Sequence, residues 1–301
     1  MQALLVDHAA PAGLRLGDAP DPQPGPGEVL VEIRAVSLNH GELRGVAGRE
    51  ANEVPGWDAA GIVRTPAADG SGPAAGSRVV TFGGEGAWAA LRAVPVGELA
   101  VVPESVDLGA AAALPVAGVT ALRALRRLGS VLGQRVLVTG ASGGVGSFAV
   151  QLGAAAGAHV IASVGSAARG AGLVELGAAE VVVGLDGVAA GLHGVLDNVG
   201  GPQLAAAFGL LGEGGSVQSI GATSGEATVF PPYATVGPLR SLQAFTMGGG
   251  LAADLTTLVE LLAAGSLNPQ IGRREPWTAV AAAAEALFAR QVSGKVVLDV
   301  G

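Results

Sequence analysis

The stretch that most constrains the fold of this chain is residues 136–158, VLVTGASGGVGSFAVQLGAAAGA, which holds no charged side chain. Its length would allow a membrane-spanning helix, because such a helix needs about 20 apolar residues. However, Gly140, Gly143, Gly144 and Gly146 cluster directly after a strand-like hexapeptide. A glycine cluster weakens a helix and suits a tight turn. The stretch therefore predicts a strand, a glycine-rich turn and a helix rather than a membrane span.

Composition excludes several classes of protein. The formal charge is −8 and the pI is near 5.0, with no block of lysine and arginine, so binding to nucleic-acid phosphates is not expected. The chain has no cysteine, which excludes disulfides, thiolate catalysis and cysteine-containing zinc sites. The segment MQALLVDHAA has no basic region of the kind that opens a secretory signal, so we expect a cytoplasmic protein. We also expect no metal site, because no ligand spacing connects the four histidines, His8, His40, His159 and His193.

The 301 residues divide into two patterns, and a chain of this length is expected to form two domains. Up to about residue 115, short apolar runs and Pro/Gly turns predict an antiparallel, barrel-like β domain. From about residue 116, apolar runs alternate with helical stretches, which predicts a doubly wound α/β domain with a parallel sheet. Two helices and a strand expected after Met247 fit either domain. The six predicted parallel strands are RVLVTG, HVIASV, EVVVGL, GVLDNVG, GSVQSIG and SLQAFTM.

The glycine-rich turn is a candidate binding site for a dinucleotide. A strand, a turn and a helix in this order let backbone N–H groups and a helix N-terminus meet a pyrophosphate, which a Cβ atom would keep away. The spacing Gly140-x-x-Gly143-x-x-Gly146 differs from the commoner GxGxxG, so a purely structural turn is the alternative. We assign the cofactor contacts of the turn to Gly140, Ala141, Ser142, Gly143, Gly144, Val145 and Gly146.

The end of the next strand indicates which dinucleotide is bound. An acidic residue about 20 positions after the turn would hold the adenosine ribose of NAD, but no Asp or Glu occurs between Gly146 and Glu175. Instead the chain offers Ser163, Ser166 and Arg169, and a guanidinium with nearby hydroxyls suits a 2′-phosphate. We infer NADPH rather than NADH. The alternative is that Arg169 is an exposed residue at a helix start.

A family resemblance rests on seven motifs that follow one another along the chain. They are AVSLNHGELR, PGWDAAGIV, ALPVAGVTAL, VLVTGASGGVGSFAVQLGAAAGAHVIA, VLDNVGG, SVQSIGATSG and GKVVLDV. In this order they resemble the medium-chain dehydrogenase/reductase superfamily over nearly the whole chain. Within it they are similar to the zinc-independent branch of quinone oxidoreductases and enoyl reductases.

The resemblance implies an α/β protein with two domains. Residues 1–116 and 248–301 would form a GroES-like, β-barrel-type catalytic domain, and residues 117–247, inserted between these two segments, would form a Rossmann NADP-binding domain. The nicotinamide would lie in the cleft between them. Zinc-dependent relatives have Cys and His where this chain has Asn39 and Trp57, so both ligand positions are lost. The implied activity is zinc-independent transfer of a hydride from NADPH to a quinone or an α,β-unsaturated carbonyl. The resemblance also implies a homodimer that acts on a small molecule.

The resemblance also suggests individual roles. Asn39 would donate its amide to the acceptor or the cofactor, or hold a turn, and Thr120 would face the nicotinamide, or bond back to its own helix. Both are candidate catalytic residues. His40 is not assigned, since a proton donor and a surface histidine are equally compatible with the sequence. On the nicotinamide side of the cofactor, relatives have binding residues at the positions of Asn198, Gly221 and Phe245.

Departures from the family leave two alternatives open. Related enoyl-thioester reductases have a tyrosine in the region where this chain reads HGELRGVAGREANEV, and the single tyrosine here is Tyr233. An enoyl reductase for a biosynthetic enone or enoyl thioester remains one alternative. The other, of a different class, is a non-catalytic NADPH-binding or structural protein.

Overall fold

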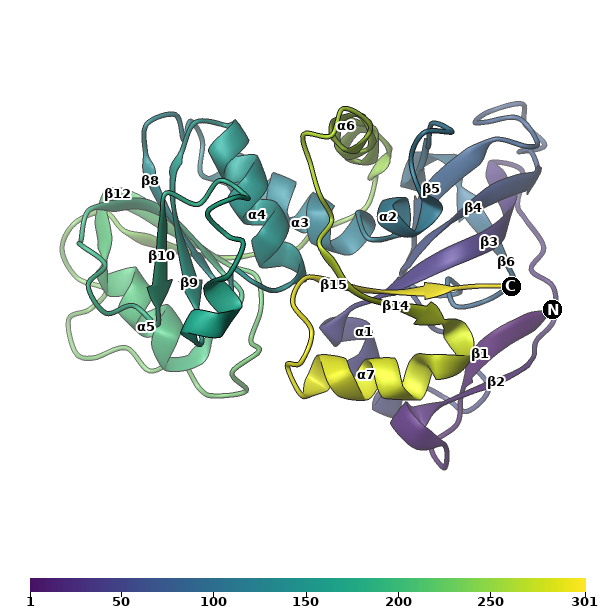
Figure 1. The fold of residues 1–301 in the computed structure, drawn as a ribbon, viewed down its shortest axis with the longest axis horizontal. Coiled ribbons are helices and arrows are strands. Elements are labelled where there is room, and N and C mark those ends of the chain that lie inside the picture. The colour runs from purple at the N-terminus through teal and green to yellow at the C-terminus, as the bar shows by residue number, and fades with distance from the viewer. The chain divides into compact units, whose positions relative to one another are not determined.

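The computed structural model describes residues 1–301, and the chain divides into two compact units (Figure 1). Unit 1 contains Met1–Val119 and Gly248–Gly301, and unit 2 contains Thr120–Met247. Both units combine strands with helices, so the predicted α/β class is confirmed. No helix in the structure has the length and apolar character needed to cross a membrane.

Unit 2 is built on a six-stranded sheet in which every neighbouring pair is parallel. The strand order is β10-β9-β8-β11-β12-β13, which is the doubly wound order of a Rossmann domain. The chain order reverses between the central strands β8 and β11, and ligands of such sheets bind beyond the carboxyl ends of strands at this point. The elements are β8 (Arg135–Thr139), α4 (Gly144–Ala155), β9 (His159–Val164), β10 (Glu180–Val183), β11 (Leu192–Asp197), α5 (Gly201–Gly209), β12 (Leu211–Ser219) and β13 (Ser241–Ala244).

The uncharged stretch of residues 136–158 lies at the centre of unit 2. It forms most of β8, the glycine turn and α4, and residues 146–153 of α4 are all buried. A helix and a strand covered on all sides need no charged face, because both are surrounded by apolar neighbours. Beside them, Leu137, Ile161 and Val195 from three strands pack with Phe208 of α5 into one core cluster.

Unit 1 contains a seven-stranded, mainly antiparallel sheet. Its path is β14-β15-β3-β4-β5-β7, with β6 paired to β3, and a separate pair is formed by β1 and β2. The strands are β1 (Gln2–Val6), β2 (Leu14–Asp18), β3 (Glu28–Leu38), β4 (Asp58–Thr65), β5 (Arg78–Phe82), β6 (Leu91–Pro95), β7 (Leu99–Val101), β14 (Ile271–Pro276) and β15 (Lys295–Asp299). The helices are α1 (His40–Gly45), α2 (Leu108–Ala112), α6 (Ala252–Ala263) and α7 (Val280–Phe288), and α3 (Pro115–Arg127) runs from unit 1 into unit 2.

The C-terminal tail completes the core of unit 1. Strand β15 pairs antiparallel with β3, and α7 contacts both β15 and α1 (Figure 1). The alanine-rich face of α7 packs with Trp88 and Ile33 in the main core cluster. One of the apolar runs of this half, AWAALRAVPV (residues 87–96), forms a strand only over Leu91–Pro95. The backbone N–H of Trp88 instead donates to the Pro55 carbonyl, and the Trp88 carbonyl accepts from the Leu4 N–H. Trp88 therefore takes no part in the pairing with β3.

Candidate active site

The glycine turn after β8 folds closely against its own backbone. Gly140 has φ +60°, and its carbonyl accepts from the Gly143 N–H at 2.9 Å. A Cβ atom on Gly146 would lie 2.3 Å from the Gly140 oxygen, so α4 can begin this close to the turn only with glycine there. The left-handed φ of Gly140 likewise favours glycine. The sequence Gly140-x-x-Gly143-x-x-Gly146 therefore has a direct steric cause in the structure.

The first turn of α4 presents backbone donors beyond the end of β8. Gly143 is the N-cap in an extended conformation, and no side chain caps the helix. The first N–H groups of a helix have no partner within it, which here concerns Gly144, Val145 and Gly146. No acidic residue lies in this turn, so the positive end of the helix dipole is not neutralised. Gly143, Gly144 and Val145 are partly exposed, and this arrangement suits a pyrophosphate.

Arg169 lies beside the glycine turn. It belongs to the short 3-10 helix Ala167–Gly170, and its Nε donates to the Ser142 hydroxyl at 3.0 Å. The Arg169 side chain is half-buried, and the exposed Ser166 precedes it as the N-cap of this short helix. The structure thus brings together a cation and the phosphate-binding turn, two features that lie 27 residues apart in the sequence.

Ser163 is placed differently from the sequence expectation. Its side chain is fully buried, and its hydroxyl donates to the Gly184 carbonyl at 2.7 Å and accepts from Gln203 Nε2 at 2.9 Å. Its backbone oxygen accepts from the Ala141 N–H at 3.0 Å. Ser163 therefore supports the turn from the neighbouring strand β9, and its hydroxyl is engaged within the protein rather than directed to a phosphate.

The remaining unit 2 candidates lie at the carboxyl ends of the adjacent strands. Asn198 follows β11, and its Nδ2 donates to the Thr139 carbonyl at 2.8 Å. Gly221 lies two residues after β12, and a Cβ atom there would be 2.8 Å from the Asn198 oxygen. Phe245 follows β13 directly, and the Arg127 guanidinium lies 4.6 Å from its ring centroid. Together with Gly140 they lie at the carboxyl end of the sheet, where dinucleotides bind in this topology.

In unit 1, the Asn39 side chain is fully engaged within the protein. Its Nδ2 donates to Glu42 Oε1 at 2.9 Å and to Asp58 Oδ2 at 2.8 Å, and its Oδ1 accepts from Lys295 Nζ at 2.6 Å. The ammonium and the two carboxylates fix the orientation of this amide, because only one assignment of nitrogen and oxygen satisfies them. In this geometry, Asn39 has no free amide hydrogen for an acceptor carbonyl and holds a buried charge network instead.

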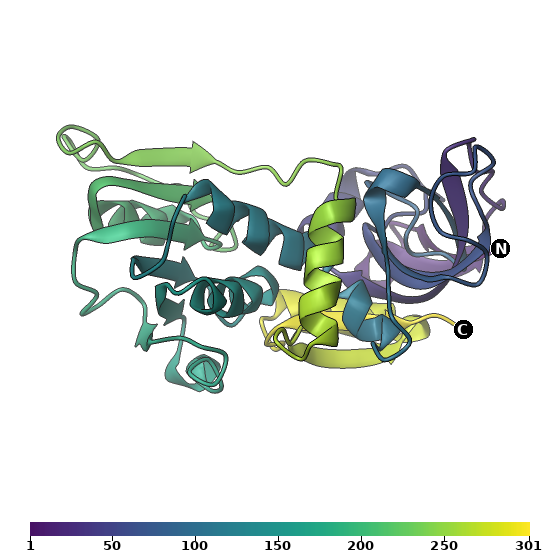
Figure 2. The same ribbon diagram turned by 90° about the horizontal axis from the view of Figure 1, so that it is seen from above.

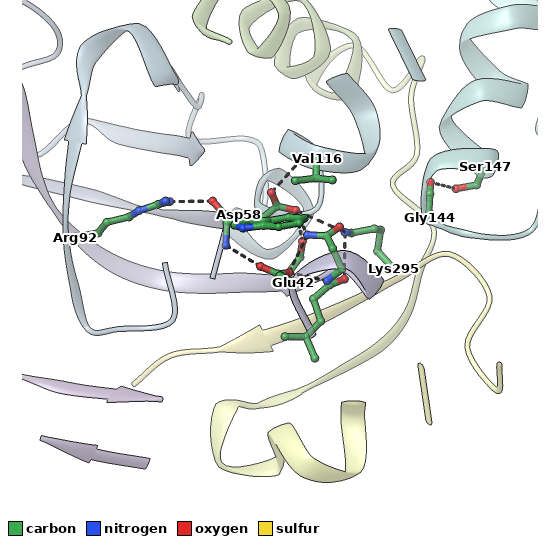
Figure 3. Close-up of polar contacts among 11 residues, drawn as sticks. Glu42, Asp58, Arg92, Val116, Gly144, Ser147 and Lys295 are labelled. Carbon is green, nitrogen blue, oxygen red and sulfur yellow. Dashed lines mark hydrogen bonds and ion pairs between the residues drawn. The ribbon is translucent and has the colours of Figure 1, made fainter. Parts of the chain in front are cut away.

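Two members of this network, Glu42 and Lys295, were not recognised from the sequence (Figure 3). Asp58 is fully buried and accepts from Ser37 Oγ at 2.9 Å and from the Val116 N–H at 3.1 Å. Lys295 Nζ lies 3.6 Å from Asp58 Oδ2, and Glu42 Oε2 accepts from the Trp57 N–H at 2.7 Å. One buried cluster thus connects the start of α1, β4, β15 and the first turn of α3.

Burial dominates the electrostatics of the cluster. Desolvation, with the nearby Asp58 charge, raises the pKa of Glu42 to about 8, and desolvation lowers the pKa of Lys295. Arg92, also buried, has its pKa lowered to about 10 by desolvation, and it donates to the Trp57 carbonyl at 3.0 Å. These shifts follow from the cost of holding charges away from water. Burial therefore disfavours the charged forms of the side chains in this cluster.

One sequence signal points to Lys295. The chain contains 17 basic residues, and all of them except Lys295 are arginines. A lysine ammonium is a compact point charge, whereas a guanidinium is a broad planar fork. The 2% exposed side chain of Lys295 occupies a site where the compact cation reaches Asn39 Oδ1, the Leu38 carbonyl and Asp58. The one lysine among 16 arginines is therefore a sequence signal for this position.

His40 and Thr120 complete the candidates. His40 is half-buried, with its ring edge-on to Phe288 at 5.8 Å and its Nδ1 buried without a partner. Burial and the charges of Arg44, Arg290 and Lys295 lower the pKa of His40, which disfavours the imidazolium that a proton donor requires. Thr120 is 6% exposed on α3 and belongs to unit 2, whereas Asn39 belongs to unit 1. The structure contains no group of three or more His, Cys, Asp or Glu side chains placed to hold a metal ion.

Two family models match the chain. Residues 25–104 match the alcohol dehydrogenase GroES-like domain, and residues 173–298 match the zinc-binding dehydrogenase domain. A chloroplastic quinone-oxidoreductase QR1 from Triphysaria versicolor is 38% identical over 190 residues, which cover 57% of this chain and 56% of the relative. The matched part thus spans just over half the length of the first curated relatives, including an Arabidopsis thaliana homologue covered to 52%.

Solved structures extend the similarity to the whole chain. A mycobacterial protein, Rv1454c complexed with NADPH, has a TM-score of 0.88 and 26% identity, covering 99% of this chain and 100% of the other. An NAD-dependent alcohol dehydrogenase has a TM-score of 0.90 and 28% identity, covering 100% of both chains. The predicted GroES-like and Rossmann folds are confirmed. The chain belongs to the medium-chain dehydrogenase/reductase superfamily and is quinone oxidoreductase-like.

Proposed function

We propose that the protein is an NADPH-dependent, zinc-independent oxidoreductase that reduces a quinone or an α,β-unsaturated carbonyl. The observation that carries the proposal is the glycine turn of unit 2 with Arg169 bonded to Ser142 at 3.0 Å. The turn offers backbone donors for a pyrophosphate, and the guanidinium offers a charge-assisted bond to a phosphate. Membership of the superfamily supports the reaction class.

Arg169 and the absence of an acidic residue favour NADPH as the cofactor. An NAD-specific site uses a carboxylate to hold the ribose hydroxyls, and no Asp or Glu occurs between Gly146 and Glu175. The NADPH complex of the mycobacterial neighbour supports the same choice, while the NAD-dependent neighbour makes NADH the competing cofactor. In this assignment, Ser166 and Arg169 contact the 2′-phosphate, and Ser163 holds the turn in place.

Bound NADPH supplies a hydride from C4 of its nicotinamide. The residues of the chain bind and orient the two reactants: Asn198, Gly221 and Phe245 would lie along the nicotinamide side, and the glycine turn would hold the pyrophosphate. A quinone or a conjugated carbonyl spreads the incoming negative charge over its own atoms, so it needs less electrophilic help than a simple ketone. Orientation in a dry site then supplies most of the rate enhancement.

The Asn39 network supports zinc independence. Asn39 and Trp57 replace the Cys and His of zinc-dependent relatives, and an indole has no lone pair suited to a metal. The carboxylates of Glu42 and Asp58 are bonded to Asn39, and the Lys295 ammonium supplies a positive charge within the network. Asn39 and Thr120 stay candidates for shaping the acceptor side, with Asn39 acting through the network rather than through a free amide.

The test is a dinucleotide titration followed by a turnover assay. Wild-type protein is titrated with NADPH and NADH by nicotinamide fluorescence, and each dinucleotide is then mixed with a quinone and with an enone. Tighter binding of NADPH and its oxidation by either acceptor would support the proposal. Preferential use of NADH, or turnover only after addition of zinc, would contradict it.

We also propose that a second copy of this chain binds at the β13 edge of unit 2. Strand β13 pairs only with β12 and forms the edge of the sheet on that side (Figure 2). The connection between these strands exposes Val229, Tyr233 and Leu239 at 73%, 82% and 80%. An open strand edge flanked by exposed apolar side chains favours association. Light scattering after size-exclusion chromatography should give the mass of a dimer for the wild type. The double variant Tyr233→Asp, Leu239→Asp should have the mass of a monomer. A monomeric wild type would contradict this proposal.

A further inference from the structure

A buried carboxylate lies at the carboxyl end of β11, next to the glycine turn. Asp197 is fully buried, and uncharged groups donate to its carboxylate, among them Thr139 Oγ1 at 2.6 Å and the Gly200 N–H at 2.8 Å. Burial raises the pKa of Asp197, which reflects the cost of a carboxylate away from water. An apolar residue would fill the same space at a lower cost. Packing alone therefore does not explain a carboxylate at this position.

Thr139 connects this carboxylate to the turn. It is the last residue of β8, and its hydroxyl both donates to Asp197 and accepts from the Asn198 N–H at 3.0 Å. The Thr139 carbonyl accepts from Asn198 Nδ2 at 2.8 Å. The paired register of β8 and β11 ends at Val138 and Leu196. Side-chain bonds thus extend the pairing by one residue, to the point where the backbone enters the turn.

The consequence is a fixed starting direction for the turn. Gly140 follows Thr139 directly, and its carbonyl receives the Gly143 N–H and faces Gly146. A rotation of the Thr139–Gly140 peptide would break the bond between the Thr139 carbonyl and Asn198 Nδ2, and it would change the direction in which the chain enters the turn and the start of α4. Two strands hold the peptide through Thr139, so the donors of the turn are already oriented before a ligand arrives. Preorganised donors bind more tightly, because no ordering cost is left.

We propose that Asp197 is a positioning residue for the dinucleotide, acting through the Thr139 hydroxyl to hold the glycine turn in its pyrophosphate-binding conformation. This inference rests on the proposed function. Because the pyrophosphate is common to both dinucleotides, loss of this support weakens NADPH and NADH equally. Loss of Arg169, by contrast, weakens NADPH alone. The two patterns separate a positioning role at the turn from recognition of the 2′-phosphate.

The experiment compares Thr139→Val, which removes the hydroxyl and keeps the shape, with the isosteric Asp197→Asn and with the double variant. Thr139→Ser keeps the hydroxyl and serves as the rescue. Thr81→Val is the matched control, because Thr81 is also fully buried and bonded to a charged side chain, Arg92 at 3.1 Å, but lies in unit 1. Dissociation constants for NADPH and NADH are measured by nicotinamide fluorescence, and urea unfolding shows which variants are folded.

We expect Thr139→Val and Asp197→Asn each to weaken both dinucleotides by about tenfold. The double variant should lose no more than the stronger single variant, since the two residues act through one bond. Thr139→Ser should bind like the wild type, and Thr81→Val should lose stability without losing affinity. If Thr139→Val does not fold, the comparison of Asp197→Asn with the wild type decides.

Different failures have different meanings. Wild-type affinity in folded Thr139→Val or Asp197→Asn, with normal NADPH binding by the wild type, would overturn the positioning role and leave the proposed function intact. A loss confined to NADPH would also overturn it, because the defect would then lie at the 2′-phosphate. A wild type that binds neither dinucleotide would overturn the proposed function and this inference together.

Discussion

At the scale of single residues, Arg169 is the side chain that we propose to set the cofactor preference. Its guanidinium approaches the glycine turn through Ser142, where a 2′-phosphate could bind it. We predict that Arg169→Ala weakens NADPH by about 10- to 150-fold, equivalent to about 1.5 to 3 kcal/mol, with little change for NADH. Arg135→Ala is a suitable control, because Arg135 lies at the opposite end of β8 and donates to backbone carbonyls of residues 189 and 190. Equal losses for both dinucleotides would contradict the assignment.

Lys295 is a buried cation of unit 1 that contacts Asn39 and Asp58. Replacing it with Met leaves Asp58 and Glu42 buried without their nearest cation. We predict a loss of about 3 to 5 kcal/mol in the free energy of unfolding, measured by urea titration. Asp58→Asn should cost less in the Lys295→Met background than in the wild type, because the two side chains interact.

An exposed ion pair provides the comparison for Lys295. Arg34 and Glu32 lie 2.7 Å apart with side chains 46% and 43% exposed. Arg34→Met should therefore cost less than about 1 kcal/mol. A similar small loss for Lys295→Met would mean that the buried cation contributes little to the network.

At the scale of elements, the contact between the glycine turn and α4 leaves no room for a side chain at Gly146. A Cβ atom at Gly146 would lie 2.3 Å from the Gly140 oxygen, whereas none of the surrounding atoms lies within 4 Å of a Cβ at Gly165. We predict that Gly146→Ala destabilises the protein by about 1 to 3 kcal/mol and weakens both dinucleotides. Gly165→Ala, which is not at positive φ, should change neither quantity. Normal dinucleotide affinity in Gly146→Ala would show that the close approach is not required for binding.

The parallel strands and the glycine turn were predictable from the sequence, because each depends on local pattern. The runs RVLVTG and HVIASV are buried on both faces of the sheet, so their continuous apolar character survives in β8 and β9. The turn required glycine for steric reasons that involve only residues 140–146. The signal for each feature therefore lies within a short stretch of sequence.

The Asn39 network was not predictable in the same way, because its members are far apart in sequence. Asn39 and Lys295 are separated by 256 positions, and their bond exists only because β15 pairs with β3. An asparagine side chain can donate a hydrogen bond to a substrate, but both amide hydrogens of Asn39 are donated to Glu42 and Asp58. For the same reason, the buried position of the Ser163 hydroxyl could not be inferred from the sequence near β9.

At the scale of the whole molecule, the buried network makes stability depend on pH. Burial and Asp58 raise the pKa of Glu42 from 4.5 to about 8, with Lys295 and Arg92 facing the same cluster. The folded chain thus holds this proton more tightly than the unfolded chain. We therefore predict that this stabilisation is complete below about pH 4.5 and is lost as the pH rises towards about 8.

Glu42→Gln tests this pH dependence. The variant loses a hydrogen bond to Asn39 or to the Trp57 N–H, so it is less stable than the wild type at pH 5. Between pH 5 and pH 8.5 the difference should move in favour of the variant, because glutamine has no proton to lose. Urea unfolding at several pH values measures it. Parallel stability curves for the two proteins would contradict the raised pKa.

The measurement that tests the central claim most directly is the oxidation of NADPH and NADH with a small panel of acceptors. The panel contains 1,4-benzoquinone, a larger ortho-quinone, a simple enone and an enoyl thioester, with EDTA present to remove free metal ions. We predict rapid oxidation of NADPH by a quinone or the enone, slower oxidation of NADH, and no effect of EDTA. Absence of turnover with every acceptor, or strict dependence on added zinc, would contradict a zinc-independent NADPH oxidoreductase.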